Sequence, residues 1–470
     1  MLWPGFVGGS YISRSVNVNA ERSINLYPEI VDAGTPKVKT WLVGTPGLKG
    51  FVNFSGKCGG PVRALFAMNG RAFAVVGQNF CEFFPNGTGI QWGDVWPSSD
   101  PASICSNGTA GNQLLIVSGG LMTLFNTATN QYTQTEFWPD ADAPNPCTMA
   151  AFLDGYFVAL ATHTRRFQIS ALEDGLDWSG LDVAEVSTSG DNLRALATSH
   201  RELWLFGEQT THVWYNSGAS NFPFQPMSSV QIEMGILAPW SVASIDNTLM
   251  WVGANKLGVG MVFRANGYTP EAVSTKAVEY WLQQKGHLDR AIAYTYQDEG
   301  HLFYVLYVPD AETTWVYDVA TGFWHERATW NEDTMAWEPH LSRCHCYAFG
   351  RHLVGDRESG QIYEMSLDLY DEDVTPLVSS IHVSVPSSSP STSASTSTSQ
   401  SPSQSESRSS SSSVSPSESE SRSSSVSISP SISASRSTSV SVSPSASESL
   451  SQSLSQSLSE SASPTPSPGG

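Results

Sequence analysis

The sequence is poor in basic residues, in cysteine and in long apolar runs. Its 470 residues include 24 Lys and Arg against 44 Asp and Glu, for a formal net charge of −20. Proteins that hold nucleic acid through its phosphates usually present a basic stripe or patch, so we expect no specific nucleic-acid binding. No run approaches the roughly 18 apolar residues of a membrane span, and residues 1–10 lack the basic and apolar regions of a secretion signal. We therefore expect a protein made in the cytoplasm that does not bind membranes.

Motifs of nucleophilic catalysis and of cofactor binding are also absent. There is no Gly-x-Ser-x-Gly, and the six cysteines are scattered, as reduced core thiols would be. Only Cys344 and Cys346, with His340, His345 and His352 nearby, hint at a metal. A strand would place both sulfurs on one face, whereas structural zinc sites usually use cysteines two to four residues apart and a second pair of ligands. We expect buried strand cysteines, no metal and no cofactor.

The sequence does contain a pattern that repeats about every 40 to 50 residues. Each unit has a short apolar run, a polar turn and a second run with an aromatic residue. The seven pairs of runs are 71–77 and 81–84, 113–117 and 121–125, 155–160 and 166–169, 202–207 and 212–215, 248–253 and 260–263, 301–306 and 315–318, and 346–349 and 361–363.

These runs predict an all-β protein, a β-propeller of six or seven blades. Runs such as 302–306 are apolar on both strand faces, which is typical of strands buried between packed blades. They are too short for helices, which need roughly 10 to 12 residues. A β-sandwich is the main alternative, but its strands would recur at a spacing of roughly 8 to 12 residues and without a longer period.

Composition divides the chain into three parts. Residues 1–57 form an N-terminal arm and closing strand, residues 58–377 the propeller, and residues 378–470 a low-complexity tail. The tail is about half serine and has too few large apolar side chains to offset its ordering entropy. We expect it to be disordered, as a linker first, with an extended stalk or a glycosylation site as alternatives. It holds five Glu and three Arg, which leaves 39 acidic and 21 basic residues, or −18, in the rest.

Two shorter segments have expected roles. An N-terminal strand would complete the last blade and remove open sheet edges; alternatively, the arm lies on a neighbouring subunit. Residues 274–284 read as a helix with Ser274 or Thr275 as the N-cap. Trp3 is the first candidate for an exposed aromatic that anchors a partner.

The main functional alternative is a propeller glycoside hydrolase, sialidase-like and acting on host-surface glycans. Such an enzyme needs two carboxyl groups about 5 to 9.5 Å apart beside sugar-binding aromatics. The candidates are Glu173, Asp177, Asp318, Glu326 and Asp333. Against this, an Asp turn such as that at Asp318 usually braces a blade edge, and the arginine cluster expected for an anionic sugar is missing.

Several segments together resemble the packaged-DNA stabilisation protein, or tail hub, of short-tailed bacteriophages. The resemblance rests on Arg14, Glu21-Arg-Ser-Ile-Asn-Leu-Tyr-Pro-Glu29, Glu202-Leu-Trp-Leu-Phe-Gly207, Ser274-Thr-Lys-Ala-Val-Glu279 and Thr314-Trp-Val-Tyr-Asp-Val-Ala-Thr-Gly-Phe-Trp-His-Glu-Arg327. Their order and spacing extend through most of residues 10–370. The serine-rich extension after residue 377 is not associated with the family's shared core.

The resemblance implies a non-enzymatic protein of the virion tail with no catalytic residues. It implies a homo-oligomeric ring, a hexamer in relatives, below the portal and its adaptor or head-completion protein. There it would close the DNA exit and be a platform for a tail needle or tailspike. An anionic wall beside DNA would let the DNA pass without sticking. The arm then supplies the candidate interface residues Trp3, Arg14, Arg22, Asn25 and Tyr27.

Overall fold

A computed structural model gives the structure of the chain. It describes residues 9–11, 21–30, 40–134, 146–161, 163–186, 190–254, 260–285, 287–309, 311–373 and 375–383. The chain divides into two units, residues 1–390 and residues 391–470. All described residues belong to the first unit, and the serine-rich stretch from residue 384 onward lies outside them.

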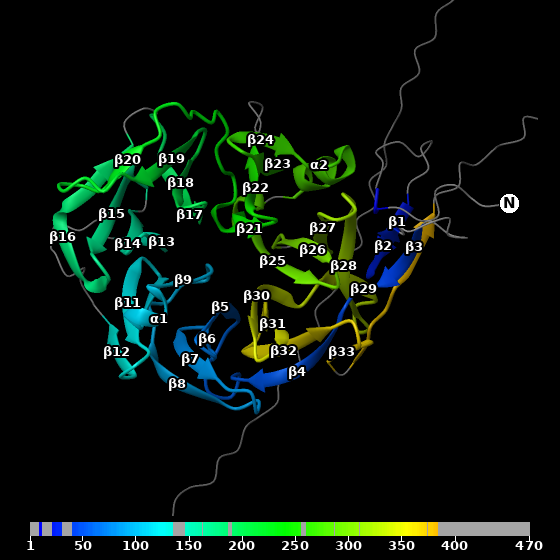
Figure 1. Ribbon diagram of the computed structural model, residues 1–470. Coiled ribbons are helices and arrows are strands. Elements are labelled where there is room, and N and C mark those ends of the chain that lie inside the picture. Colours follow the sequence, from blue (N-terminus) through cyan, green and yellow to red (C-terminus); the bar gives the residue numbers. More distant parts are fainter. Residues whose placement is uncertain are drawn as a thin grey trace, which may run out of the picture. The chain divides into compact units, whose positions relative to one another are not determined.

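Among the described residues of the first unit, seven sheets each have a core of four antiparallel strands (Figure 1). We number these blades in chain order. Blades 1 to 3 are β5 (Val62–Met68), β6 (Arg71–Val76), β7 (Asn79–Phe83) and β8 (Gly89–Asp94); β9 (Ser103–Ser106), β10 (Gln113–Ser118), β11 (Leu121–Asn126) and β12 (Gln131–Gln134); and β13 (Cys147–Leu153), β14 (Tyr156–Ala161), β15 (Arg166–Ala171) and β16 (Asp174–Glu185).

Blades 4 to 7 follow the same order. They are β17 (Leu193–Ser199), β18 (Glu202–Gly207), β19 (Thr211–Asn216) and β20 (Phe224–Pro226); β21 (Ala243–Ile245), β22 (Thr248–Ala254), β23 (Gly260–Asn266) and β24 (Thr269–Ala272); β25 (Ile292–Asp298), β26 (His301–Tyr307), β27 (Thr314–Asp318) and β28 (Trp324–Asn331); and β30 (Ser342–Ala348), β31 (Arg351–Asp356) and β32 (Gln361–Ser366) with β4 (Gly47–Asn53).

The blades form a closed circle. The first strand of each blade lies innermost and contacts the first strand of the next: β5 contacts β9, β9 contacts β13, and β13 contacts β17. The 3-10 helix η1 (Pro239–Ser241), which leads into β21, contacts β17 and β25; β25 then contacts β30, and β30 returns to β5. Figure 1 shows these strands around the centre. The predicted all-β propeller is therefore confirmed.

The N-terminal strand β4 closes the circle. It is the outer strand of blade 7 and pairs antiparallel with β32 over residues 47–53, with Lys49 opposite Glu364. This closure is one of the two arrangements that the sequence left open. A sheet edge that would otherwise be exposed is paired, as propellers require.

The remaining short strands extend blades 6 and 7 or lie beside them. β1 (Glu21–Ile24) pairs parallel with β28 and antiparallel with β35 (Ser380–Val383), so part of the stretch assigned to the tail forms a strand on blade 6. The others are β2 (Leu26–Ile30) paired with β3 (Thr40–Gly44), β29 (Ala336–Pro339) on β28, and β33 (Asp371–Glu372) on β4 with β34 (Thr375–Pro376).

The positions of the tight turns distinguish the two faces of the disc. In six blades the first and second strands are joined by two residues that both have positive φ, as in Asn69-Gly70, Asp154-Gly155 and His200-Arg201. These are type I′ turns, which match the twist of antiparallel strands. Blade 2 instead has α1 (Gly108–Gly111) at this point. Because strand direction alternates, these turns share one face, the hairpin face; the inter-blade links lie on the other, the linker face.

The predicted helix is present as α2 (Lys276–Gln283). Thr275 is its N-cap, and the Thr275 hydroxyl accepts a hydrogen bond from the Val278 amide. Leu282 and Trp281 pack into the core between blades 5 and 6. The second 3-10 helix, η2 (Leu288–Arg290), follows.

The seventh sequence unit was partly misassigned. Its first run, 346–349, lies at the end of the inner strand β30 and in the turn after it, and not in a second strand. The second strand is β31, where His352 precedes Leu353 and Val354. It was missed because its apolar run is only two residues long before Gly355.

Candidate functional site

The N-terminal arm is fastened to blade 6 by a buried carboxylate. Glu326 on β28 has no exposed surface, and its carboxylate accepts the Ser10 hydroxyl at 2.7 Å. Arg22 on β1 donates from Nη2 at 2.8 Å and from Nε at 3.1 Å, so the guanidinium is bidentate. Charge-assisted bidentate pairs of this kind fix orientation as well as adding energy. We call Ser10, Arg22 and Glu326 the arm clasp.

Asn25 continues the attachment. Its φ of 59° lies in the left-handed region, which Asn tolerates better than most residues. The Asn25 amide donates to the carbonyls of Ala328 and Val378 at 2.7 Å each, and its oxygen accepts the Ala328 amide at 3.0 Å. A single side chain therefore joins β28 to Val378, which lies shortly before β35.

Tyr27 and His301 attach the next part of the arm, strand β2, to blade 6. Tyr27 is buried in an edge contact with the Phe303 ring, and burial raises the pKa of its hydroxyl. His301 lies between two carboxylates, with Nε2 2.7 Å from Glu29 and Nδ1 2.8 Å from Asp318. Burial opposes protonation of His301, but the two carboxylates outweigh it, and the pKa is raised overall.

The five candidate interface residues are placed as follows. Trp3 and Arg14 lie outside the described residues. The Arg22 side chain is 34% exposed, whereas Asn25 and Tyr27 are buried against their own blade. These last three fasten the arm within one subunit, and their role between subunits stays a prediction. Sequence reasoning did not single out Ser10 or His301, whose roles depend on contacts between opposite ends of the propeller sequence.

The carboxylates of the hydrolase alternative do not meet at a cavity. Glu326 belongs to the arm clasp. The Asp318 carboxylate accepts hydrogen bonds from the Thr321 hydroxyl and the Ala320 amide and contacts the His301 ring, so it stabilises the turn after β27. Neither these two nor Glu173, Asp177 or Asp333 lines any of five prominent cavities in the described part of the chain.

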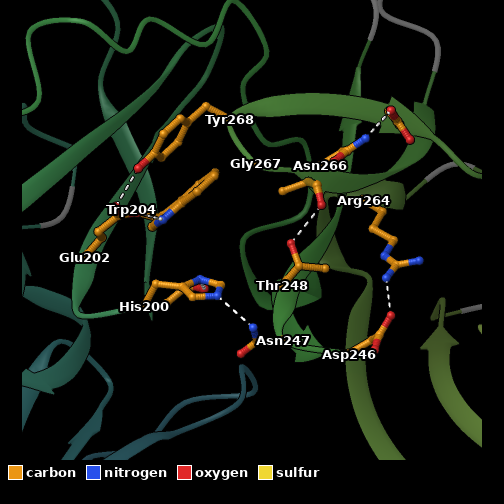
Figure 2. A pocket seen from close by; sticks show the side chains of 13 residues that line it. His200, Glu202, Trp204, Asp246, Asn247, Thr248, Arg264, Asn266, Gly267 and Tyr268 are labelled. Carbon is orange, nitrogen blue, oxygen red and sulfur yellow. Dashed lines mark hydrogen bonds and ion pairs between the residues drawn. The ribbon is translucent and has the colours of Figure 1, made fainter.

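The largest of these cavities, about 730 Å³, lies on the hairpin face between blades 4 and 5 (Figure 2). Its carboxylates are already bound. Glu202 accepts the Tyr268 hydroxyl at 2.6 Å and the Trp204 ring nitrogen at 3.3 Å, and Tyr268 stacks on Trp204. Asp246 pairs with Arg264. The Glu202–Tyr268 contact joins one blade to the next, and the arrangement favours a link between blades over a binding site.

The other cavities are lined by inner strands, by the ends of neighbouring strands and by the links between blades. The cavity at its linker face, about 390 Å³, is lined by Arg194, Arg290, Arg343 and Arg357 but only by Asp100 and Asp289 among the acids. This lining differs from the strongly anionic average of the chain.

The cysteine pair that hinted at a metal lies on the inner strand β30. Cys346 is buried, and the Cys344 sulfur lies 3.6 Å from the Val62 carbonyl oxygen. His345 contacts His352 at 3.0 Å, and burial lowers the pKa of His345 to about 3. Within the described ranges, no three His, Cys, Asp or Glu side chains are grouped to hold a metal ion. No described helix is long and apolar enough to span a membrane.

Solved structures resemble this chain only in fold. The extracellular domain of a putative hybrid two-component system from B. thetaiotaomicron aligns with 10% identity and a TM-score of 0.46, over 68% of this chain and 40% of that one. YCF48 from Cyanidioschyzon merolae aligns with 10% identity and a TM-score of 0.41, over 68% of this chain and 98% of that one. This chain thus spans less than half of the bacterial protein. No curated protein matches the sequence.

A family model gives the decisive match. The model described as "Bacteriophage P22 Gp10, beta-propeller" aligns with residues 6–370, which include the arm clasp and all seven blades. The chain therefore belongs to the bacteriophage P22 Gp10 family of β-propeller structural proteins, which stabilise packaged phage DNA.

Proposed function

We propose that this protein is a non-enzymatic hub of the virion tail that closes the portal channel. Six copies would form a ring below the portal adaptor or head-completion protein and offer a platform for a tail needle or tailspike. The single observation that supports this most is the closure of the disc. β4 completes blade 7, and the arm clasp fastens the segment before it to blade 6. A unit closed in this way suits a mechanical part.

The retention of DNA would then be steric. A chain with a net charge of −20 repels phosphate, so DNA would be held by a plugged channel and not by adhesion. Two of the carboxylates considered for hydrolysis fit this role, because Glu326 and Asp318 are engaged in structural contacts. A head-to-tail contact between identical subunits closes into a ring when its rotation allows.

Mass measurement of the purified chain, alone and with the portal adaptor, tests the proposal. A hexamer would have six times the 50.7 kDa mass of the single chain. We expect the hexamer to form when the adaptor is added, or to make up a larger share of the chain than it does without the adaptor. A chain that stays monomeric with the adaptor present contradicts the ring.

A further inference from the structure

The centre of the propeller channel holds two buried arginines that form no ion pair in the described part of the chain. Arg63 on β5 is 2% exposed and Arg343 on β30 is 6% exposed. Arg63 donates to the backbone carbonyls of Asp100 and Gly77 at 2.6 and 2.9 Å. Arg343 has one long contact, 3.5 Å, to the Ser99 carbonyl. One buried nitrogen of each guanidinium, Nη2 of Arg63 and Nε of Arg343, has no partner.

These two charges line one cavity of about 290 Å³, and no carboxylate lines it with them. Apolar residues also line it, such as Leu65 of blade 1, Met149 of blade 3 and Trp240 of η1. Burial lowers the pKa of both guanidinium groups, and the charge of Arg343 lowers that of Arg63 further, to about 10. The carboxylate of Asp100 opposes the shift at both arginines without forming an ion pair with either. Two buried positive charges that line the same cavity are unfavourable unless an opposite charge binds beside them.

The neighbouring cavity at the linker face shares Arg343 and adds Arg290, which is exposed and has no ion-pair partner among the described residues. Its other cations, Arg194 and Arg357, are paired with Glu208 and with Glu338 and Glu358. Asp100 and Asp289 are the acids of this lining, and both are exposed. An anion entering from this face would meet Arg290 first and Arg343 deeper.

We propose that the mouth of the channel is a binding site for a small oxyanion, a phosphate or a carboxylate group. Arg343 and Arg290 bind it, and the charge of Arg63 adds to the attraction. Guanidinium groups suit both ligands, since their fork of N–H donors matches two oxygens at once. Because Arg343 is 6% exposed, water and salt screen its charge less than that of an exposed guanidinium.

Calorimetric titration of the full chain tests this site. Inorganic phosphate and malonate are titrated separately, with sodium chloride holding the ionic strength constant. We expect saturable binding of at least one of them. Binding of phosphate alone would assign the site to phosphate groups, and binding of malonate alone would assign it to carboxylates. Binding of both would assign it to oxyanions in general.

Three variants complete the test. Arg290→Gln, at an exposed position that does not threaten folding, should weaken binding about tenfold or more, as loss of a charge-assisted hydrogen bond does. Arg343→Gln should weaken it further. Arg166→Gln removes a cation of blade 3 that is 60% exposed and does not line the cavity, and it should leave binding unchanged. The proposal is overturned if neither anion binds, if Arg290→Gln binds like the wild type, or if Arg166→Gln weakens binding equally.

Discussion

The arm clasp leads to an asymmetric prediction. Replacing Arg22 by Met leaves the carboxylate of Glu326, fully buried, with the Ser10 hydroxyl as its remaining side-chain donor. Removing one partner of a buried pair in this way costs about 3 to 5 kcal/mol of unfolding free energy. Glu326→Gln should cost less, about 1.5 to 3 kcal/mol, because the Arg22 side chain left behind is 34% exposed and can be hydrated.

Urea unfolding at one fixed protein concentration measures these differences. The double variant should lose clearly less than the sum of the two single variants, by more than about 1 kcal/mol, because the residues are in direct contact. Arg166→Met is the matched control: its pair with Glu185 is exposed on both sides and should contribute about 0 to 1 kcal/mol. The reasoning is refuted if Arg22→Met costs no more than this control.

Three further predictions follow from the same region. Burial raises the pKa of Glu372 to about 7, so the folded chain binds a proton at this carboxyl more tightly than the unfolded chain does. The free energy of unfolding should therefore fall as the pH rises from about 4.5 to about 7, by up to about 3 kcal/mol. Glu372→Gln should remove this part of the pH dependence, as measured by urea unfolding at about pH 5 and about pH 8. Asn25→Ala should cost about 3 kcal/mol, and Asn25→Gly about 1 kcal/mol less, because glycine keeps the positive φ while both lose the bonds to Ala328; equal losses would show that the backbone strain is unimportant. A chain ending at Leu377 should melt below one ending at Pro390, because only the longer chain keeps β35 on β1, and the longer chain should form the same oligomers as the full chain.

The middle strands could be read from the sequence because they are buried on both faces. β18 and β26 are nearly continuous runs of Leu, Trp, Phe, Tyr and Val, and they are the runs that predicted the repeat. Inner strands such as β5 and β17 were not identified. Their last residues face the channel and are only half-buried, so polar and small side chains interrupt the apolar pattern.

A second signal was present but not used. Six of the seven first turns are dipeptides with two positive φ values, and Asn69-Gly70 and Asp154-Gly155 are strong hairpin signals in sequence. Turns such as His200-Arg201 carry no such signal, because the tertiary structure imposes their conformation. A search for Asn-Gly and Asp-Gly dipeptides would therefore have located the ends of the inner strands β5 and β13.

The site residues were harder to predict than the fold. Arg22, Asn25 and Tyr27 were selected with the arm, but their partners on β26 and β28 could not be inferred without the circular topology. The channel arginines Arg63 and Arg343 lie in the first and last blades and are isolated in sequence, so nothing local marks them as neighbours. The net charge did not reveal these arginines either, because it sums the charges of the whole chain and says nothing of where they lie.

The most direct test of the account is DNA retention in phage particles made without this protein. If the protein stabilises packaged DNA by closing the exit, heads should fill to full length, then release DNA that nuclease digests, and adding the purified chain before release should prevent the loss. Particles that keep their DNA equally well without the protein would contradict the central claim.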